Sequence, residues 1–299
     1  MLVAFVFEWQ FSPARFFQDL SEISVRGYLA QIERETIRVL ISRTQIGNTA
    51  PNDVQTELSR ELETIFLSQQ LITGLPFSLN ENGIYEQYED GHRVGLISAT
   101  INIACASAFM SDFIHKNKYG EVIQDTKKQR DAYKALVRNV VKDKFDRDSC
   151  LRAILRSYHQ SLQDPRNSLI YLYEVIENLE VRLGGSNNSD ARKTMVSELS
   201  QFRLFELGGE CIFDPSLEVD KCLREIDKTC SSQYCVSKLT QRMLKRLGQI
   251  ANNKEIRQGR HRGQTLEELR DVELGEMSEA VKTARCLIEA YLRWLDSEG

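Results

Sequence analysis

At the start of the chain, large apolar side chains stand at every second position, and this pattern constrains the fold more than any other feature. These residues are Val3, Phe5, Phe7, Trp9 and Phe11. A period of two residues is typical of a β-strand that buries one face. Further strands are expected over residues 27–33, 36–42, 69–79, 84–89 and 92–97. We therefore predict an antiparallel, β-rich N-terminal domain over residues 1–120.

Local signals refine this domain. The dipeptide Asp90-Gly91 separates the last two expected strands, and this pair favours a tight hairpin turn. Residues 54–68 carry apolar side chains at helical spacing, and Asn52 or Asp53 is expected to cap that helix. The N-terminal domain is thus predicted to be a small antiparallel sheet with one or two helices.

In the second part of the chain the apolar spacing becomes helical. Helices are expected over residues 126–144, 147–163, 191–207 and 236–250. Another helix is expected to begin at Asp164-Pro165 and to end at Gly184-Gly185. The fold class predicted for the whole chain is therefore α+β, with an antiparallel β-rich domain followed by an all-α domain over residues 121–299.

The last helix is expected to follow Gly263. Thr265 and Glu268 have the spacing of a capping box, in which each side chain bonds the backbone of the other residue. An apolar stripe continues from there to Leu295. Gly275 interrupts the stripe, so a kink or a break is expected there.

Composition excludes several classes of protein. The 299 residues suit two domains, and 41% hydrophobic with 27% charged residues is ordinary for a soluble globular chain. No apolar run approaches the roughly 18–20 residues that span a bilayer. The apolar N-terminus ends at Glu8 and has no basic region, unlike a signal peptide. We expect a cytoplasmic protein with no membrane partner.

The cysteines and the known nucleotide motifs bear on cofactors. Four of the seven cysteines lie close together in sequence, at Cys211, Cys222, Cys230 and Cys235. Their spacing matches no common zinc pattern and no histidine lies among them, so reduced thiols are favoured over a metal site. The chain also lacks a phosphate-binding loop and a dinucleotide fingerprint. We therefore expect no cofactor and no metal.

Positive charge gathers between residues 238 and 262. The only acid there is Glu255, against eight basic residues: Lys238, Arg242, Lys245, Arg246, Lys254, Arg257, Arg260 and Arg262. On a chain with a net charge of −4, this segregation predicts a local surface for a polyanion. Nucleic-acid contacts are expected from Arg262, Lys254, Arg246, Lys245 and Arg242.

A histidine within this segment adds acid–base chemistry. His261 lies between Arg260 and Arg262, and histidine exchanges protons near neutral pH. RNA cleavage through the 2′-hydroxyl needs no metal: His261 would transfer the proton, and Arg257 and Arg260 would stabilise charge on the phosphorane. The alternative is structural. In that case the arginines form salt bridges, and His261 is buried against Glu267 or Asp271.

A helical domain that ends in an Arg- and His-containing loop and a long C-terminal helix resembles the HEPN superfamily, over about residues 126–299. The resemblance implies an all-α domain that forms homodimers and, in many members, a metal-independent ribonuclease of toxin or antiviral systems. The family's motif places four to six residues between Arg and His. Here Arg257 and His261 have three between them, whereas Arg152 and His159 have six.

Two functions follow as expectations. The first is an RNA-targeting effector of a bacterial defence or toxin system, an endoribonuclease whose catalytic residues are His261, Arg257 and Arg260. The alternative is a non-catalytic dimeric interaction or nucleic-acid-binding protein. In both, the β-rich domain would receive a protein or ligand trigger.

Overall fold

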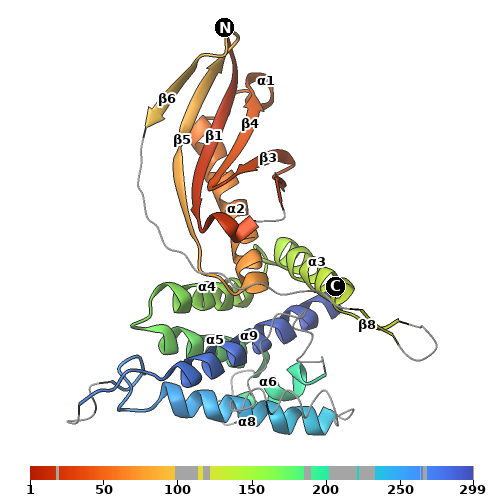
Figure 1. The fold of residues 1–299 in the computed structure, drawn as a ribbon, viewed down its shortest axis with the longest axis vertical. Helices are drawn as coiled ribbons and strands as arrows, with labels where there is room; N and C mark the ends of the chain where they lie inside the picture. Colours follow the sequence, from red (N-terminus) through yellow and green to blue (C-terminus); the bar gives the residue numbers. More distant parts are fainter. Residues whose placement is uncertain are drawn as a thin grey trace. The chain divides into compact units, whose positions relative to one another are not determined.

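The computed structural model describes residues 1–17, 20–97, 114–116, 122–184, 190–201, 221, 233–262, 264 and 268–298. The chain divides into two compact units, Met1–Ala108 and Phe109–Gly299. The first unit holds an antiparallel sheet and the second is mostly helical (Figure 1). The predicted α+β class is confirmed. The division follows Ala108, so the expected boundary at residue 120 falls inside the second unit.

A six-stranded antiparallel sheet builds the first unit, in the order β2-β3-β4-β1-β5-β6. Its strands are β1 (Leu2–Ser12), β2 (Glu22–Val25), β3 (Tyr28–Glu33), β4 (Thr36–Ser42), β5 (Ser78–Tyr88) and β6 (Arg93–Ile97). In the central strand β1, Phe7 lies opposite Val39 of β4 and Ile84 of β5. All three side chains are buried, because the alternating pattern directs them to the same face of the sheet.

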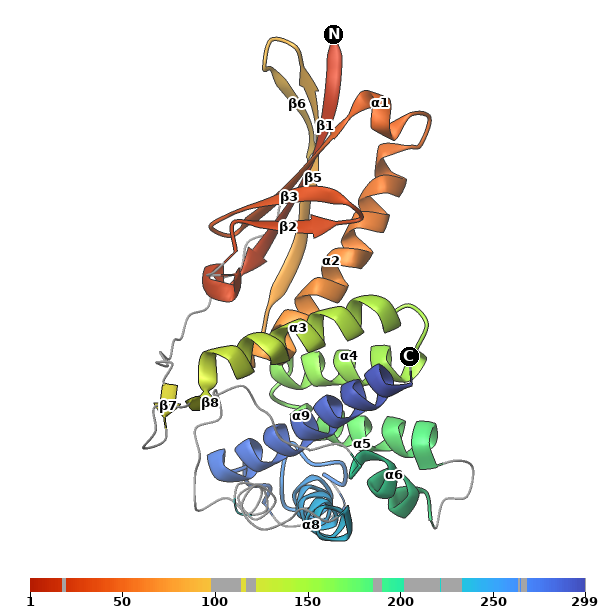
Figure 2. The same ribbon diagram turned by 90° about the vertical axis from the view of Figure 1, so that its right-hand side faces the viewer.

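The helix α2 (Pro51–Thr73) covers that face (Figure 2). The Trp9 Nε1 donates a hydrogen bond to Ser59 Oγ of α2 at 3.0 Å. Phe66 of α2 contacts four further rings at centroid distances of 4.9–5.6 Å, from Phe11, Phe16, Phe17 and Phe77. Two short helices complete the unit, η1 (Ala14–Phe17) and α1 (Arg43–Ile46). The first core is therefore a sheet face sealed by one helix and an aromatic cluster.

Two sequence predictions for the first unit are wrong. The expected strand over 69–79 is in part the last turn of α2, because Leu71 and Ile72 are buried and continue its apolar face. Gly74 then ends the helix in the left-handed region, at φ 69°. At the other end the N-cap is Ala50, with Pro51 in the first turn, so neither Asn52 nor Asp53 caps α2.

The expected hairpin between β5 and β6 is confirmed. The Tyr88 N–H donates to the His92 carbonyl at 2.9 Å. Gly91 lies in the turn at φ 80°, a conformation that costs little without a Cβ.

Helices dominate the second unit. After the two short strands β7 (Ile114–Lys116) and β8 (Val122–Asp125), its elements are α3 (Thr126–Lys144), α4 (Ser149–Gln163), α5 (Ser168–Gly184), α6 (Ala191–Leu199), α8 (Gln233–Ala251) and α9 (Leu274–Ser297). The C-terminal helix α9 contacts α3, α4, α5, α6 and α8 and runs among them (Figures 1 and 2). Its residues Leu287, Ile288 and Leu292 are buried. The second core is thus organised around the end of the chain.

A buried polar cluster joins α3 to α9 inside this core. The Glu289 Oε1 accepts from the Tyr133 hydroxyl at 2.7 Å and from Arg285 Nε at 3.2 Å. Burial raises the pKa of Glu289 above its ordinary value. The two donors compensate for removing the carboxyl group from water.

Three helix boundaries differ from the predictions. Helix α5 begins at Ser168 rather than Pro165, since Asp164 ends α4 and its carboxylate accepts from the Arg166 N–H at 3.0 Å. Helix α6 ends at Leu199, short of residue 207; residues 202–207 lie outside the described part. Helix α9 begins only at Leu274, so Gly275 stands in its first turn and not in the middle of a helix, where a kink was expected.

The side chains of Cys211, Cys222, Cys230 and Cys235 also lie outside the described residues. None of the helices in the described ranges combines the length and the apolar character that crossing a membrane requires.

Candidate nucleic-acid interface

Helix α8 leads into a tightly folded segment, residues 252–262, which we call the arginine loop. The Arg260 N–H returns to the Ala251 carbonyl at 2.8 Å, and the Gly259 N–H donates to Ile256 at 3.0 Å. Ile256 is fully buried. A Cβ on Gly259 would lie 2.9 Å from the Asn253 carbonyl oxygen. The loop therefore depends on glycine at this position.

A second set of bonds fastens the arginine loop to the segment before α9. Ile256 and Arg270 form a parallel bridge, in which the Arg257 N–H donates to Arg270 at 2.9 Å and the Arg270 N–H to Glu255 at 2.9 Å. The Gln258 amide extends the pairing, because its Oε1 accepts from the Val272 N–H at 3.0 Å. The loop is held at both ends by backbone-directed bonds.

Two of the predicted site arginines reach α5 and the turn before it. Arg260 Nη2 donates to Glu177 Oε1 at 2.9 Å, and its guanidinium lies 4.3 Å from the centre of the Tyr173 ring. Arg262 donates to the Arg166 carbonyl at 3.0 Å and to Asn167 Oδ1 at 2.7 Å. Both side chains therefore attach the loop to its own unit.

Arg257 is placed differently. Its Nη2 donates to the Leu269 carbonyl at 3.0 Å, and its Nη1 lies 3.7 Å from Asp271 Oδ1. The side chain nevertheless stays 57% exposed. Because Arg257 and Arg260 engage different segments, the structure does not place them as a pair of clamps on one acceptor.

His261 lies between the two anchoring arginines and is half-buried. Within the described residues its ring has no hydrogen bond or ion pair, while its carbonyl accepts from the Gln264 N–H at 3.1 Å. Asp271 bonds Gln258 at 3.1 Å and lies near Arg257, not His261. Glu267 lies outside the described residues. The ring is thus neither sealed in the core nor paired with Asp271.

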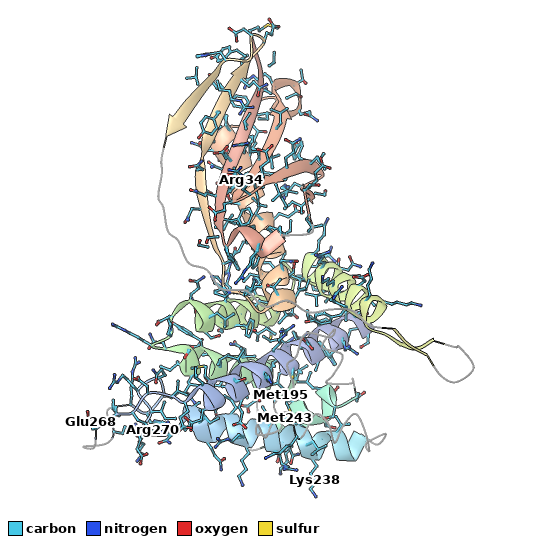
Figure 3. All side chains as sticks on the ribbon, viewed as in Figure 1. Arg34, Met195, Lys238, Met243, Glu268 and Arg270 are labelled. Carbon is cyan, nitrogen blue, oxygen red and sulfur yellow. The ribbon has the colours of Figure 1, made fainter. Side chains whose placement is uncertain are left out.

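The remaining basic residues divide between surface and interior contacts. Lys238, Arg242 and Lys245 are exposed on α8, at spacings that place them on one side of a helix. Lys238 projects away from the helices in Figure 3. Lys254 is also exposed. Arg246 instead bonds the buried Glu279 of α9 through Nε at 2.6 Å, so it joins two helices.

The other Arg–His pair with family spacing has a structural arginine. Arg152 Nη1 donates to the carbonyls of Phe145 and Asp146, at 2.9 and 2.6 Å. These carbonyls lie in the turn that follows α3. Arg152 thus holds the connection between α3 and α4.

Sequence reasoning missed the partners that position the site. Nothing in the sequence analysis singles out Tyr173, Glu177 or Gln258. The four-residue spacing of Tyr173 and Glu177 on α5 was the available signal, because it places both on one face of the helix.

Charge is distributed unequally between the units. Residues 1–108 contain seven arginines, no lysine and thirteen acids, a net charge of −6; the other 32 basic and 30 acidic residues give Phe109–Gly299 a net charge of +2. Every lysine of the chain therefore belongs to the unit that carries α8 and the arginine loop.

Comparison of this chain with protein-family models, with curated proteins and with solved structures finds no match. The resemblance to the HEPN superfamily therefore stays a prediction.

Proposed function

We propose that the helical unit binds RNA through a basic face formed by Lys238, Arg242, Lys245, Lys254 and Arg257. One observation carries the proposal. In the basic segment, the exposed side chains of Lys238, Lys245 and Lys254 lie beside Arg242 and Arg257, which are exposed as well, whereas Arg246 bonds a buried glutamate of α9. Such exposed cations bind the phosphate backbone by releasing its counterions. The function best supported is non-catalytic binding.

The charge difference between the units supports the same conclusion. A polyanion is repelled by the first unit, at −6, and attracted locally to the second. The choice of RNA over DNA rests on the HEPN resemblance, as does the proposed role in a bacterial defence or toxin system. The same proposal includes a homodimer formed through the helical unit and a protein or ligand trigger that the first unit binds. The proposed location is the cytoplasm.

The binding experiment replaces three lysines of the basic face together. The triple variant Lys238→Ala, Lys245→Ala and Lys254→Ala should raise the Kd for a labelled mixed-sequence RNA by about tenfold, and lower the salt slope of binding by about two. The control carries the same charge change on α3, as Lys127→Ala, Lys134→Ala and Lys142→Ala. Equal losses in the two triple variants would refute a localised basic face.

Metal-independent cleavage is the second candidate function. The half-buried ring of His261, which has no polar partner in the described part of the chain, favours it, because a proton-transfer residue must reach substrate. Arg257 is the arginine exposed enough to meet a phosphate beside it. RNA incubated with the protein in EDTA should be cut by the wild type and not by His261→Ala. Cleavage by both proteins would exclude His261 as the proton-transfer residue.

A further inference from the structure

We infer that the Glu177 carboxylate occupies, on Arg260, the position that a phosphate group of RNA takes on binding, so that the unbound protein is partly self-inhibited. The inference rests on the proposed function. In the unbound protein Arg260 anchors the arginine loop by bonding Glu177. When RNA displaces Glu177, Arg260 binds a phosphate group instead.

The first support is the fixed position of the Arg260 guanidinium. It lies 4.3 Å from the centre of the Tyr173 ring, and Tyr173 is itself buried. The Tyr173 hydroxyl accepts from Arg192 Nη2 at 3.2 Å, and Arg192 also bonds Glu180. Since stacking on a fixed aromatic ring orients the guanidinium, Arg260 keeps its place whichever anion it binds.

The second support is the chemistry of the exchange. Carboxylate and phosphate oxygens both match the forked donors of arginine. Arg260 uses one nitrogen, Nη2, for Glu177, and the two side chains are 31% and 44% exposed. An ion pair this open to water is weak. A phosphodiester that arrives with several neighbouring phosphates can therefore displace a single carboxylate.

The third support is that the loop stays attached after the exchange. Arg262 bonds two neutral acceptors, the Arg166 carbonyl and Asn167 Oδ1. These contacts, and the bridge between Ile256 and Arg270, are independent of Glu177. Displacing Glu177 thus exposes a cation without unfolding the segment that carries it.

Helix α5 provides a matched control for this inference. Its three glutamates have different partners: Glu174 accepts from Ser157, Glu177 from Arg260 and Glu180 from Arg192. Glu177→Gln and Glu174→Gln remove the same charge from the same helix, about one turn apart. Only the first releases an arginine of the loop.

The test compares these variants by the anisotropy of a labelled mixed-sequence RNA at several salt concentrations. Glu177→Gln should lower the Kd by about two- to fivefold relative to Glu174→Gln, the range expected from loss of an exposed ion pair. A Kd for Glu177→Gln equal to or higher than that of Glu174→Gln would overturn the inference.

A second variant shows whether the gain passes through Arg260. In the background of Arg260→Gln, which removes the cation that Glu177 holds, Glu177→Gln should no longer improve binding. An unchanged gain would assign the effect to charge alone and overturn the inference. The proposed function has a separate test. If the basic-face triple variant binds RNA as well as the wild type does, the proposed function is refuted, whatever the comparison of glutamates shows.

Discussion

Gly259 shows how closely the arginine loop folds on itself. Three carbonyl oxygens would surround a Cβ there, those of Asn253 at 2.9 Å and of Ala251 and Ile256 at 3.1 Å. All three are backbone atoms, so a methyl group at this position could be accommodated only if the backbone itself moved. The glycine is needed for this close approach, because the position has no room for a methyl group.

Gly259→Ala should therefore lower the free energy of unfolding by about 1–3 kcal/mol, the usual cost of overpacking a buried position. Urea denaturation followed by circular dichroism measures the change. RNA binding should weaken as well, because the loop carries Arg257 and Arg260.

Gly248 provides the matched control in the same region. It lies within α8, and a Cβ there would meet the Tyr173 ring at an ordinary 3.9 Å. Since alanine favours a helix interior over glycine, Gly248→Ala should raise the free energy of unfolding by up to about 1 kcal/mol. Destabilisation of similar size in both variants would contradict the steric argument for Gly259.

At the scale of elements, the beginning of α9 is set by one glutamate. Glu276 accepts from Arg270 at 2.8 and 2.9 Å and from the Glu273 N–H at 3.1 Å. These bonds, chiefly those from Arg270, hold the pKa of Glu276 below its ordinary value of 4.5. Arg270, which Figure 3 labels beside the helix, also forms the bridge to Ile256. The helix start and the arginine loop therefore share a residue.

Glu276→Gln should lower the free energy of unfolding by about 1 kcal/mol at neutral pH, the usual value of a helix cap. A lowered folded-state pKa stabilises the protein above the ordinary pKa, and this contribution is lost as the pH falls through the folded value. The difference between wild type and variant should thus be full above about pH 5 and shrink as the pH falls below 4.5. Urea unfolding at a series of pH values measures it.

Glu268→Gln is the control for this charge change. Glu268 is exposed and has no polar partner in the described part of the chain, so its variant should match the wild type at every pH. A constant difference between Glu276→Gln and wild type down to acid pH would refute the role of the ionised carboxylate.

The helices of the second unit show why local sequence signals predicted some helix boundaries and missed others. The bounds of α3 followed from its spacing, and Asp148 supplies the cap for α4. Before α9, by contrast, the sequence offers the capping box of Thr265 with Glu268, but the helix begins later and uses Glu273 with Glu276. Arg270 lies between the two pairs and forms the bridge with Ile256, which is incompatible with a helix there. A tertiary contact overrode the local signal.

The sequence predicted the basic residues of the candidate site but not the residues to which the arginines bond. The basic residues could be counted along the chain. The acceptors of Arg260 and Arg262, however, lie 83 and 95 residues earlier, at Glu177 and Asn167. Spacing within the loop carries no information on contacts so remote in sequence, so anchoring arginines and exposed lysines look alike there.

At the scale of the whole molecule, the two units should be separable. Each has its own core, one sealed by α2 and the other built around α9. Residues 1–108 and 109–299, expressed separately, should each unfold in one cooperative transition. The second fragment should bind RNA within about twofold of the full chain, and the first should not bind, because of its net charge.

Calorimetry and RNA titration of both fragments test this division. Loss of binding by the 109–299 fragment, while it remains folded, would show that the first unit contributes to the interface. Binding by the 1–108 fragment would contradict the electrostatic argument.

The confinement of lysine to the second unit has a practical consequence for labelling. The first lysine of the chain is Lys116, so amine-reactive reagents find no lysine side chain in the first unit. Attachment to a sensor surface through lysines would consequently fix the protein by its second unit, where Lys238, Lys245 and Lys254 of the basic face can be modified, and would weaken the measured RNA binding of an intact protein. Dyes and tethers for binding studies belong on the acidic unit.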